Sequence, residues 1–334
     1  MKLFNLFNKK KSDSEQIPAP VSAPAPVSAP APVSAEVEAA PAYNPEPLPS
    51  SSAITIDDID TLWANSRDLD GFTVEVCVSA SSDVGTVRTN NEDNLVIDNR
   101  VLNPGCSNMV SYSEEFSHEK DFRIFAVFDG MGGESSGEKA ALAAANCLAG
   151  QYSSIRYSDV KNDAIYAYTA QANAAVVQLG ADEKVFMGTT AAIVVIDRGW
   201  LLCFNCGDSR IYLIRDNKLI QLSVDHTYAQ FKADRGQISI NEIKTDPDRN
   251  CLTRNIGDAN DTSGRKMHCA RPIRALDGDA VLICSDGLYD VCSEEEIISA
   301  LNNDGNCAYA LTEISKQNNS KDNATAIVIR IRLI

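Results

Sequence analysis

Acidic residues stand at four separate ends of apolar runs, where a chain leaving a strand presents a carboxylate at the edge of a sheet. Asp129 follows F-A-V-F, Asp286 follows V-L-I-C-S, and Asp322 comes just before A-T-A-I-V-I. Glu92 and Asp93 precede a fourth apolar run. Each residue alone is typical of a turn. Four strand ends with the same pattern, with Gly or Asn directly after the acid as at Asp129, Asp286 and Asp322, predict one shared acidic site.

The chemistry of this acidic set favours hard divalent cations. Its ligands are oxygens, with no cluster of histidine or cysteine nearby, which favours Mg²⁺ or Mn²⁺ over Zn²⁺. Crowded carboxylates repel one another unless cations lie between them. A pair of ions would explain the crowding and would activate a water molecule for an in-line displacement. Arg88, a planar fork of donors four residues before Glu92, suits two oxygens of a phosphate group.

The glycine-rich segment after Asp129 approaches two nucleotide-binding motifs and fails both. Gly132 and Gly137 have the spacing of a phosphate-binding P-loop, but Glu138 stands where that motif requires lysine. Ser135 stands where the dinucleotide fingerprint requires its third glycine. Nucleotide binding through this loop is therefore disfavoured. The sharp turn that glycine permits suits close approach to an ion, with the Gly130 carbonyl beside the Asp129 carboxylate.

Hydrophobic periodicity predicts the elements that position these residues. Runs rich in β-branched and aromatic residues predict strands at Arg123–Phe128, Ala191–Asp197, Leu201–Asn205, Ile211–Arg215, Ala280–Cys284 and Ala324–Ile334. Alanine-rich stretches predict helices at Glu138–Leu148 and Asp163–Leu179, and the capping box S-E-E-E predicts a third helix beginning at Ser293. The pattern indicates an α+β fold in which antiparallel sheets pack together with helices outside.

The segments that connect these elements lead to further predictions. The three strands between residues 191 and 215 are joined by turns too short for a crossover helix, so we expect them to be antiparallel neighbours. Leu102–Asp121 is polar and irregular and is expected to be a loop. Thr227–Asn250 is polar with helical tendency and is expected to be a surface excursion beside a site.

The N-terminal segment differs from the rest of the chain. Ten of the thirteen prolines lie before residue 50, and the hexad P-A-P-V-S-A occurs three times from Pro18 to Ala35. Such a segment cannot bury enough apolar surface to fold. We therefore predict a disordered tail and linker over residues 1–70 and a folded domain over 71–334. The tail is either a spacer or a ligand for a proline-reading domain, and a spacer is favoured.

Composition limits the partners and the compartment. The chain has 30 basic and 46 acidic residues, a formal charge of −16, and such a surface disfavours nucleic acid. The start lacks the apolar stretch and cleavage site of a signal peptide, and no segment reaches the length of a membrane span. Ten cysteines occur singly, as expected of reduced core residues. We expect a cytoplasmic protein without stable membrane insertion.

Eight motifs in order, over most of the chain from about Gly71, resemble the type 2C, metal-dependent (PPM) serine/threonine phosphatases in their bacterial form. They are R-T-N-N-E-D at 88–93, V-F-D-G-M-G-G at 127–133, M-G-T-T at 187–190, N-C-G-D-S-R-I-Y at 205–212, D-H-T at 225–227, L-T-R-N-I-G at 252–257, C-S-D-G-L-Y-D at 284–290 and D-N-A-T at 322–325. The resemblance implies a central β-sandwich flanked by helices on both sides, a four-layer αββα fold.

The resemblance also implies roles for particular residues. Asp129 would bridge two Mn²⁺ or Mg²⁺ ions, and Gly130 would ligate through its carbonyl. Asp286 and Asp322 would hold one ion, and Glu92 and Asp93 would act largely through bound water. Arg88 would bind the substrate phosphate. In many bacterial relatives a third, weaker metal site uses an acidic residue shortly before G-T-T, for which Asp182 or Glu183 is the candidate. Thr227–Asn250 matches the family's flap, which would border the substrate groove.

Two positions depart from the family pattern, and three further residues are expected to stand outside its chemistry. Met131 replaces the histidine that animal relatives carry as the suggested general acid, so another group must protonate the leaving oxygen. Tyr289 replaces the usual tryptophan, a change expected to affect packing only. Asp208, Ser209 and Arg210 are expected to form a buried scaffold.

The implied activity is a phosphoric monoester hydrolase that removes phosphate from phosphoserine and phosphothreonine on proteins, opposing a bacterial serine/threonine kinase, with a monomer as the default state. Two alternatives stay open. One is a silent regulator that binds phosphoproteins, which would be marked by loss of a metal carboxylate, and none is missing. The other is a general small-molecule phosphoesterase, which the groove loops rather than the motifs would distinguish. The physiological substrate, the metal used in the cell and the partner of the tail are not encoded in these motifs.

Overall fold

The computed structural model describes residues 74–102, 109–116, 122–132, 136–261, 263–264, 266–302 and 306–333. The predicted tail and linker, residues 1–70, lie outside these ranges.

The described chain forms two antiparallel sheets. The first has the strand order β10-β9-β13-β14-β1-β4 and the second the order β11-β8-β7-β5-β2-β3, with β12 paired to β8 and β6 to β5. The first sheet comprises β1 (Val74–Asp83), β4 (Met109–Phe116), β9 (Arg210–Arg215), β10 (Lys218–Gln221), β13 (Ala280–Cys284) and β14 (Ala324–Leu333). The second comprises β2 (Asp93–Ile97), β3 (Arg100–Val101), β5 (Phe122–Gly132), β6 (Met187–Thr189), β7 (Ala191–Asp197), β8 (Trp200–Cys206), β11 (His268–Cys269) and β12 (Ile273–Arg274).

The central strands are apolar on both faces because both faces are covered. Along β5, Phe125 and Val127 enter the core between the two sheets, whereas Ile124, Ala126 and Phe128 pack under helices on the outer face. This alternation follows from the two-residue period of a strand. It explains why the sequence shows continuous apolar runs instead of alternating polar and apolar residues.

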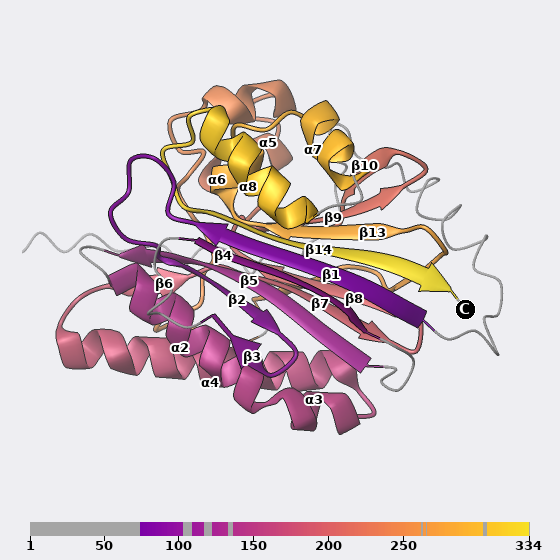
Figure 1. The fold of residues 1–334 in the computed structure, drawn as a ribbon. Helices are drawn as coiled ribbons and strands as arrows, with labels where there is room; N and C mark the ends of the chain where they lie inside the picture. Colours follow the sequence, from indigo (N-terminus) through magenta and orange to yellow (C-terminus); the bar gives the residue numbers. More distant parts are fainter. Residues whose placement is uncertain are drawn as a thin grey trace, which may run out of the picture. The chain divides into compact units, whose positions relative to one another are not determined.

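Helices cover the outer face of each sheet (Figure 1). One layer contains α2 (Ser136–Gly150), α3 (Tyr152–Tyr157) and α4 (Lys161–Glu183), and fully buried alanines on α2 let that helix lie close to the second sheet. The opposite layer contains α7 (Glu294–Leu301) and α8 (Cys307–Gln317), which pack against β13 and β14. The predicted α+β fold, a sandwich of antiparallel sheets between helices, is therefore confirmed.

The capping box predicted at Ser293 is present. The Ser293 hydroxyl accepts a hydrogen bond from the Glu296 N–H, and the Glu296 carboxylate accepts one from the Ser293 N–H. The two alanine-rich helices also form, and both extend a few residues beyond their predicted ends.

The prediction that the three strands between residues 191 and 215 are neighbours is only partly right. β7 and β8 pair as expected, but β9 belongs to the other sheet, where it pairs with β10 and β13. The turn after β8 carries the chain across the sandwich, with Gly207 at a φ of 96°. A Cβ there would lie 2.6 Å from the Thr190 Cγ2 atom, so only glycine fits this crossing.

Two further expectations are corrected. Residues 109–116, inside the segment predicted to be a loop, form β4, which pairs with β1 at the edge of the first sheet. The strand predicted at Arg123–Phe128 continues to Gly132, because β6 pairs with its last three residues.

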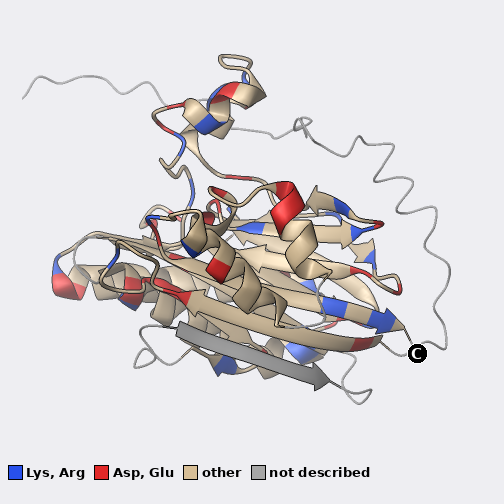
Figure 2. Ribbon diagram, turned by 45° about the horizontal axis from the view of Figure 1, so that its top comes forward, with Lys and Arg blue, Asp and Glu red and all other residues tan. Residues whose placement is uncertain are grey.

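The excursion predicted at Thr227–Asn250, named the flap from here on, contains α5 (Tyr228–Asp234) and the 3₁₀ helix η1 (Ile240–Thr245). Lys232 joins its two halves by ion pairs to Asp246 and Asp248, with N–O distances of 2.5 and 3.0 Å. Acidic and basic residues lie chiefly in loops, at helix ends and at strand ends (Figure 2). No helix within the described ranges is long and apolar enough to cross a membrane.

Candidate metal centre

The centre of the predicted site is a pair of aspartates on adjacent strands. Asp93, the first residue of β2, lies directly opposite Asp129 of β5 in the antiparallel register. Asp93 is buried, whereas Asp129 keeps some accessible surface. The two carboxylates that the sequence placed at different strand ends are thus brought together by strand pairing.

Backbone contacts fix Asp129 from the side of β6. Its N–H donates to the Thr190 Oγ1 atom at 2.9 Å, and its carbonyl accepts from the Thr190 N–H at 2.8 Å. The Thr189 hydroxyl donates to the same carbonyl at 2.9 Å. The M-G-T-T motif therefore positions the central carboxylate through its two threonines.

Gly130 lies where three segments meet. Its N–H donates to the Glu92 carbonyl at 3.1 Å. A Cβ at this position would lie 2.1 Å from the Gly137 carbonyl oxygen and 2.5 Å from the Glu92 carbonyl oxygen. The start of α2 can pack against the end of β5 only because residue 130 has no side chain. The Gly137 N–H in turn donates to the Glu92 carboxylate, which suits an anion at a helix N-terminus.

Asp286 begins α6 (Asp286–Tyr289), a helix of four residues directly after β13. The carboxyls of Asp286 and Asp129 lie within hydrogen-bonding reach of each other. The preceding residue, Ser285, donates to the Asp93 Oδ2 atom at 2.8 Å. The C-S-D-G motif thus delivers one carboxylate to the site and orients a second one.

Asp322 precedes β14 and meets Arg88 at the outer edge of the site. The Arg88 Nη2 atom donates to the Asp322 Oδ2 atom at 2.7 Å, and Glu92 lies 3.9 Å from the other guanidinium nitrogen. Arg88 remains 46% exposed, so a ligand can reach it. Asn323 stabilises the loop that carries these residues, since its amide binds the carbonyls of Val84 and Asn90 and accepts from the Glu92 N–H.

Burial and mutual repulsion raise the pKa values of the central carboxyls. Burial, with the charges of Asp286 and Asp322 in addition, raises the pKa of Asp93 to about 7, although hydrogen bonds from Thr325 and Ser285 oppose the shift. Burial, then Asp93 and Asp286, raises the pKa of Asp129 well above its usual range. Burial and the charge of Asp322 raise the pKa of Asp286 to about 6. The fold therefore holds these carboxyl groups close together although their ionised forms repel one another.

This donor set fits divalent cations. Its groups are oxygen donors, which suit Mn²⁺ or Mg²⁺, and a cation between the carboxylates would remove the repulsion that raises their pKa values. Within the described ranges, no three His, Cys, Asp or Glu side chains form a ready-made metal-binding group.

The candidates for a third metal, Asp182 and Glu183, have other partners. They lie at the C-terminal end of α4, where Asp182 accepts from Gln178 at 2.8 Å. Glu183 forms an ion pair with Lys139 of α2 at 2.7 Å. A third metal site at Asp182 or Glu183 stays a prediction.

Asp208 belongs to the electrostatics of the site, although the sequence indicated only a scaffold role. Its side chain is buried, and burial followed by the charges of Asp286 and Asp225 raises its pKa well above the usual range. Asp208 is also among the charges that raise the pKa of Asp129. The signal in the sequence was an acidic residue two positions after the end of an apolar strand, since β8 ends at Cys206.

Comparisons with known proteins agree with this geometry. Residues 78–235 match the family model described as Protein phosphatase 2C. The chain is 32% identical over 255 residues to the serine/threonine protein phosphatase PstP of Mycobacterium tuberculosis, strain H37Rv, across 75% of this chain and 44% of that protein. It is 27% identical over 235 residues to the protein phosphatase PhpP of Streptococcus pneumoniae, strain R6, across 68% of this chain and 85% of that protein.

The fold is also similar to that of solved phosphatase structures. The catalytic domain of PstP, crystallised in complex with two manganese ions, superimposes with a TM-score of 0.62 at 27% identity, across 78% of this chain and all of that one. The first curated relatives are longer proteins, of which this chain spans less than half the length.

Proposed function

The chain carries a protein phosphatase 2C domain, and we propose that it hydrolyses phosphoserine and phosphothreonine on proteins. One observation carries the proposal: buried carboxylates from separate strands converge around Asp129, with an exposed arginine, Arg88, at their outer edge. Carboxylates for metal and a guanidinium for phosphate are the two parts that a metal-dependent phosphomonoesterase needs.

The groups proposed to hold two Mn²⁺ or Mg²⁺ ions are the side chains of Asp129, Asp93, Asp286, Asp322 and Glu92 and the carbonyl of Gly130. When bound, such ions supply Lewis-acid chemistry, since they polarise the phosphoryl group and lower the pKa of water. The chain contributes a rigid frame: Thr190 fixes Asp129, Ser285 fixes Asp93, and Asn323 fixes the loop of Glu92.

Arg88 is proposed to bind the substrate phosphate through its two terminal nitrogens. Its ion pair with Asp322 is partly exposed, so the energy of breaking it is small. If Asp322 held a cation, its ion pair with Arg88 would weaken and the guanidinium would be available to the phosphate oxygens. Residue 131 is methionine, which has no proton to donate, so the proton of the leaving oxygen comes from elsewhere.

The biological setting follows from the activity. The protein is proposed to oppose a serine/threonine kinase, to act in the cytoplasm and to work as a monomer. The Pro/Ala-rich segment before residue 50 is proposed to be a spacer that leaves the basal activity unchanged when it is removed.

The test measures phosphate release from a phosphothreonine peptide with Mn²⁺, with EDTA, and with the Asp286→Asn variant. We expect turnover that requires metal and that falls at least about 100-fold in the variant, because one central ligand is lost. Asp163→Asn, an exposed position in the first turn of α4, is the matched control and should retain wild-type activity. A folded protein that releases phosphate from sugar phosphates but not from the peptide would overturn the proposed substrate class.

A further inference from the structure

The helix that carries Asp286 is too short to hold its own position. α6 has four residues, Asp286–Tyr289, and an isolated turn of helix is unstable in water. Its N-terminal half is fixed by α8 and by the residue before β14: the Gly287 carbonyl accepts from the Ser315 hydroxyl at 2.7 Å, and a Cβ on Gly287 would lie 2.0 Å from the Asn323 carbonyl oxygen. Its C-terminal half is fixed by different partners.

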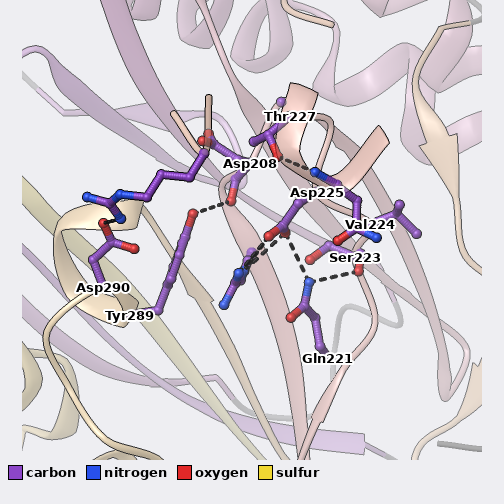
Figure 3. A network of polar contacts seen from close by, with 12 residues as sticks. Asp208, Gln221, Ser223, Val224, Asp225, Thr227, Tyr289 and Asp290 are labelled. Atoms are coloured by element: carbon purple, nitrogen blue, oxygen red, sulfur yellow. Dashed lines mark hydrogen bonds and ion pairs between the residues drawn. The ribbon is translucent and has the colours of Figure 1, made fainter. Parts of the chain in front are cut away.

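The first of these partners is the Arg210 guanidinium, which lies 3.8 Å from the centroid of the Tyr289 ring. Asp225 holds Arg210 in place through both carboxylate oxygens, at 2.6 to 3.1 Å. The Tyr289 hydroxyl then donates to the Asp208 carbonyl at 3.1 Å (Figure 3). Tyr289 therefore contacts Arg210 through its ring and Asp208 through its hydroxyl. Because Asp225 lies two residues before Thr227, the start of the flap is tied to Tyr289.

The second partner comes from the other end of the flap. Arg249, one residue before the flap ends, donates through Nη1 to the Asp290 Oδ2 atom at 2.8 Å. Asp290 follows Tyr289 directly and caps α6 at its C-terminus. In Figure 3 the Tyr289 and Asp290 side chains extend from the same end of the helix. Both ends of the flap thus reach adjacent residues of the helix that begins with Asp286.

Arg249 also interacts electrostatically with the carboxylate of Asp286. The hydrogen bond and charge of Asp290 raise its pKa, and the charge of Asp286 adds to the shift. Arg249 and Asp290 are 40% and 30% exposed. A pair this accessible to water is weak enough to open and close, whereas the Arg210–Asp225 pair is less exposed, at 22% and 10%.

We propose that Arg249 is a positioning residue that latches the flap to Asp290 and thereby couples the position of the flap to the placement of Asp286. A substrate protein bound against the flap would favour the closed Arg249–Asp290 ion pair. Asp286 would then be held most firmly in place when the flap is occupied. The inference rests on the proposed function only for the nature of that occupant, a phosphoprotein. The coupling itself is a property of the chain.

The experiment compares Arg249→Ala, Arg249→Lys and wild type by amide hydrogen exchange of the metal-free protein and by Mn²⁺ titration calorimetry. Loss of the latch should make exchange in both the flap and α6 about two- to five-fold faster, the factor available from one partly exposed ion pair. Mn²⁺ affinity should fall by a similar factor. The lysine variant keeps the charge and should recover most of both effects.

Arg235→Ala is the matched control. Arg235 lies in the same flap but stacks on Phe231, 4.2 Å from the ring centroid, so its removal should leave exchange in α6 and Mn²⁺ affinity at wild-type values. Faster exchange confined to the flap, with α6 and Mn²⁺ affinity unchanged in Arg249→Ala, would overturn the coupling. Equal effects from Arg235→Ala would overturn it too.

The same variants separate the latch from the enzymatic proposal. If wild type hydrolyses the phosphothreonine peptide, Arg249→Ala should raise KM for that peptide more than KM for a small aryl phosphate. If wild type hydrolyses neither substrate, the proposed function fails, while coordinated changes in exchange and Mn²⁺ affinity would still support the latch.

Discussion

Asp93 and Asp129 are direct cross-strand partners, one on β2 and one on β5. Opposite charges in such a position stabilise a sheet, and like charges destabilise it. Here the strand register, set by the buried apolar residues on both sides, keeps the two carboxyls together. The spacing of the central acidic pair is therefore a property of the sandwich core, and a cation is the group that makes it favourable.

The first prediction concerns the pH dependence of the metal-free protein. The folded-state pKa of Asp93 is about 7 and that of Asp286 about 6, both above the ordinary value near 4 of the unfolded chain. Between the pKa of the unfolded chain and the higher pKa values of the folded state, the folded state binds more protons than the unfolded state. The stability that these groups contribute therefore falls as pH rises. In EDTA, we expect the melting temperature to increase by several degrees as pH falls from about 7 to about 5.

Asp93→Asn tests the cause of that dependence. Asparagine keeps an oxygen to accept the Ser285 hydrogen bond but removes the buried charge. The variant should be more stable than wild type in EDTA at pH near 7.5, and its melting temperature should change less with pH. A wild-type melting temperature that falls on acidification across this window would contradict the assignment.

The second prediction is that Mn²⁺ stabilises the fold through these carboxylates. At a free concentration 100 times Kd, a ligand that binds only the folded state adds about 2.7 kcal/mol. For a domain of this size that corresponds to a rise in melting temperature of roughly 5–10 °C. Asp129→Asn should abolish most of the rise, because Asp129 contacts Asp286 and faces Asp93. Asp163→Asn should show the full rise, and a full rise in Asp129→Asn would exclude Asp129 as a ligand.

Local sequence was enough to predict the residues of the acidic set. An apolar strand followed by Asp and Gly, as at 129 and 286, places a carboxylate at a sheet edge whatever the topology. The capping box at Ser293 is equally local, since its donors and acceptors lie within four residues. These predictions depended on short-range geometry, which the residue types determine.

Features that depend on distant partners could not be predicted in the same way. β9 joins the opposite sheet because Gly207 lets the chain cross against Thr190, a contact that the sequence does not reveal. β4 is a strand only because β1 offers it an edge. Asp208 resembles any turn aspartate until the fold places it near Asp286. In each case the deciding interaction joins residues far apart in the chain.

The third prediction concerns Arg88. Replacing it with alanine removes a charge-assisted bond to the substrate phosphate, an interaction of about 1.5–3 kcal/mol, so kcat/KM for the phosphopeptide should fall roughly 10- to 100-fold. The melting temperature should change little, because the ion pair with Asp322 is partly exposed. Arg88→Lys should recover only part of the activity, since a lysine cannot bind two oxygens in one plane.

Inhibition by inorganic phosphate gives an independent measure of the same contact. The inhibition constant should rise in Arg88→Ala by a factor comparable to the loss in kcat/KM. An unchanged inhibition constant together with a lower kcat would show that Arg88 acts on another step and does not hold the phosphate.

The fourth prediction concerns the close packing around Gly130, which shapes the site. In Gly130→Ala the new Cβ would lie 2.1 Å from the Gly137 carbonyl oxygen and 2.5 Å from that of Glu92, and both atoms are backbone. The start of α2 or the end of β5 must therefore move, at a cost of about 3 kcal/mol or more. We expect a clear fall in melting temperature in EDTA and in Mn²⁺ alike, together with loss of the Mn²⁺-induced rise.

Gly150→Ala is the control for this change. Gly150 ends α2, and a Cβ there has no heavy atom within 4 Å, so alanine should be neutral or should stabilise the protein by up to about 1 kcal/mol. Both variants add one methyl group to a glycine, in one case to the β5 residue packed against the start of α2 and in the other to the last residue of α2. If Gly130→Ala melted like wild type and still bound Mn²⁺, the close packing of α2 against β5 would not be what shapes the site.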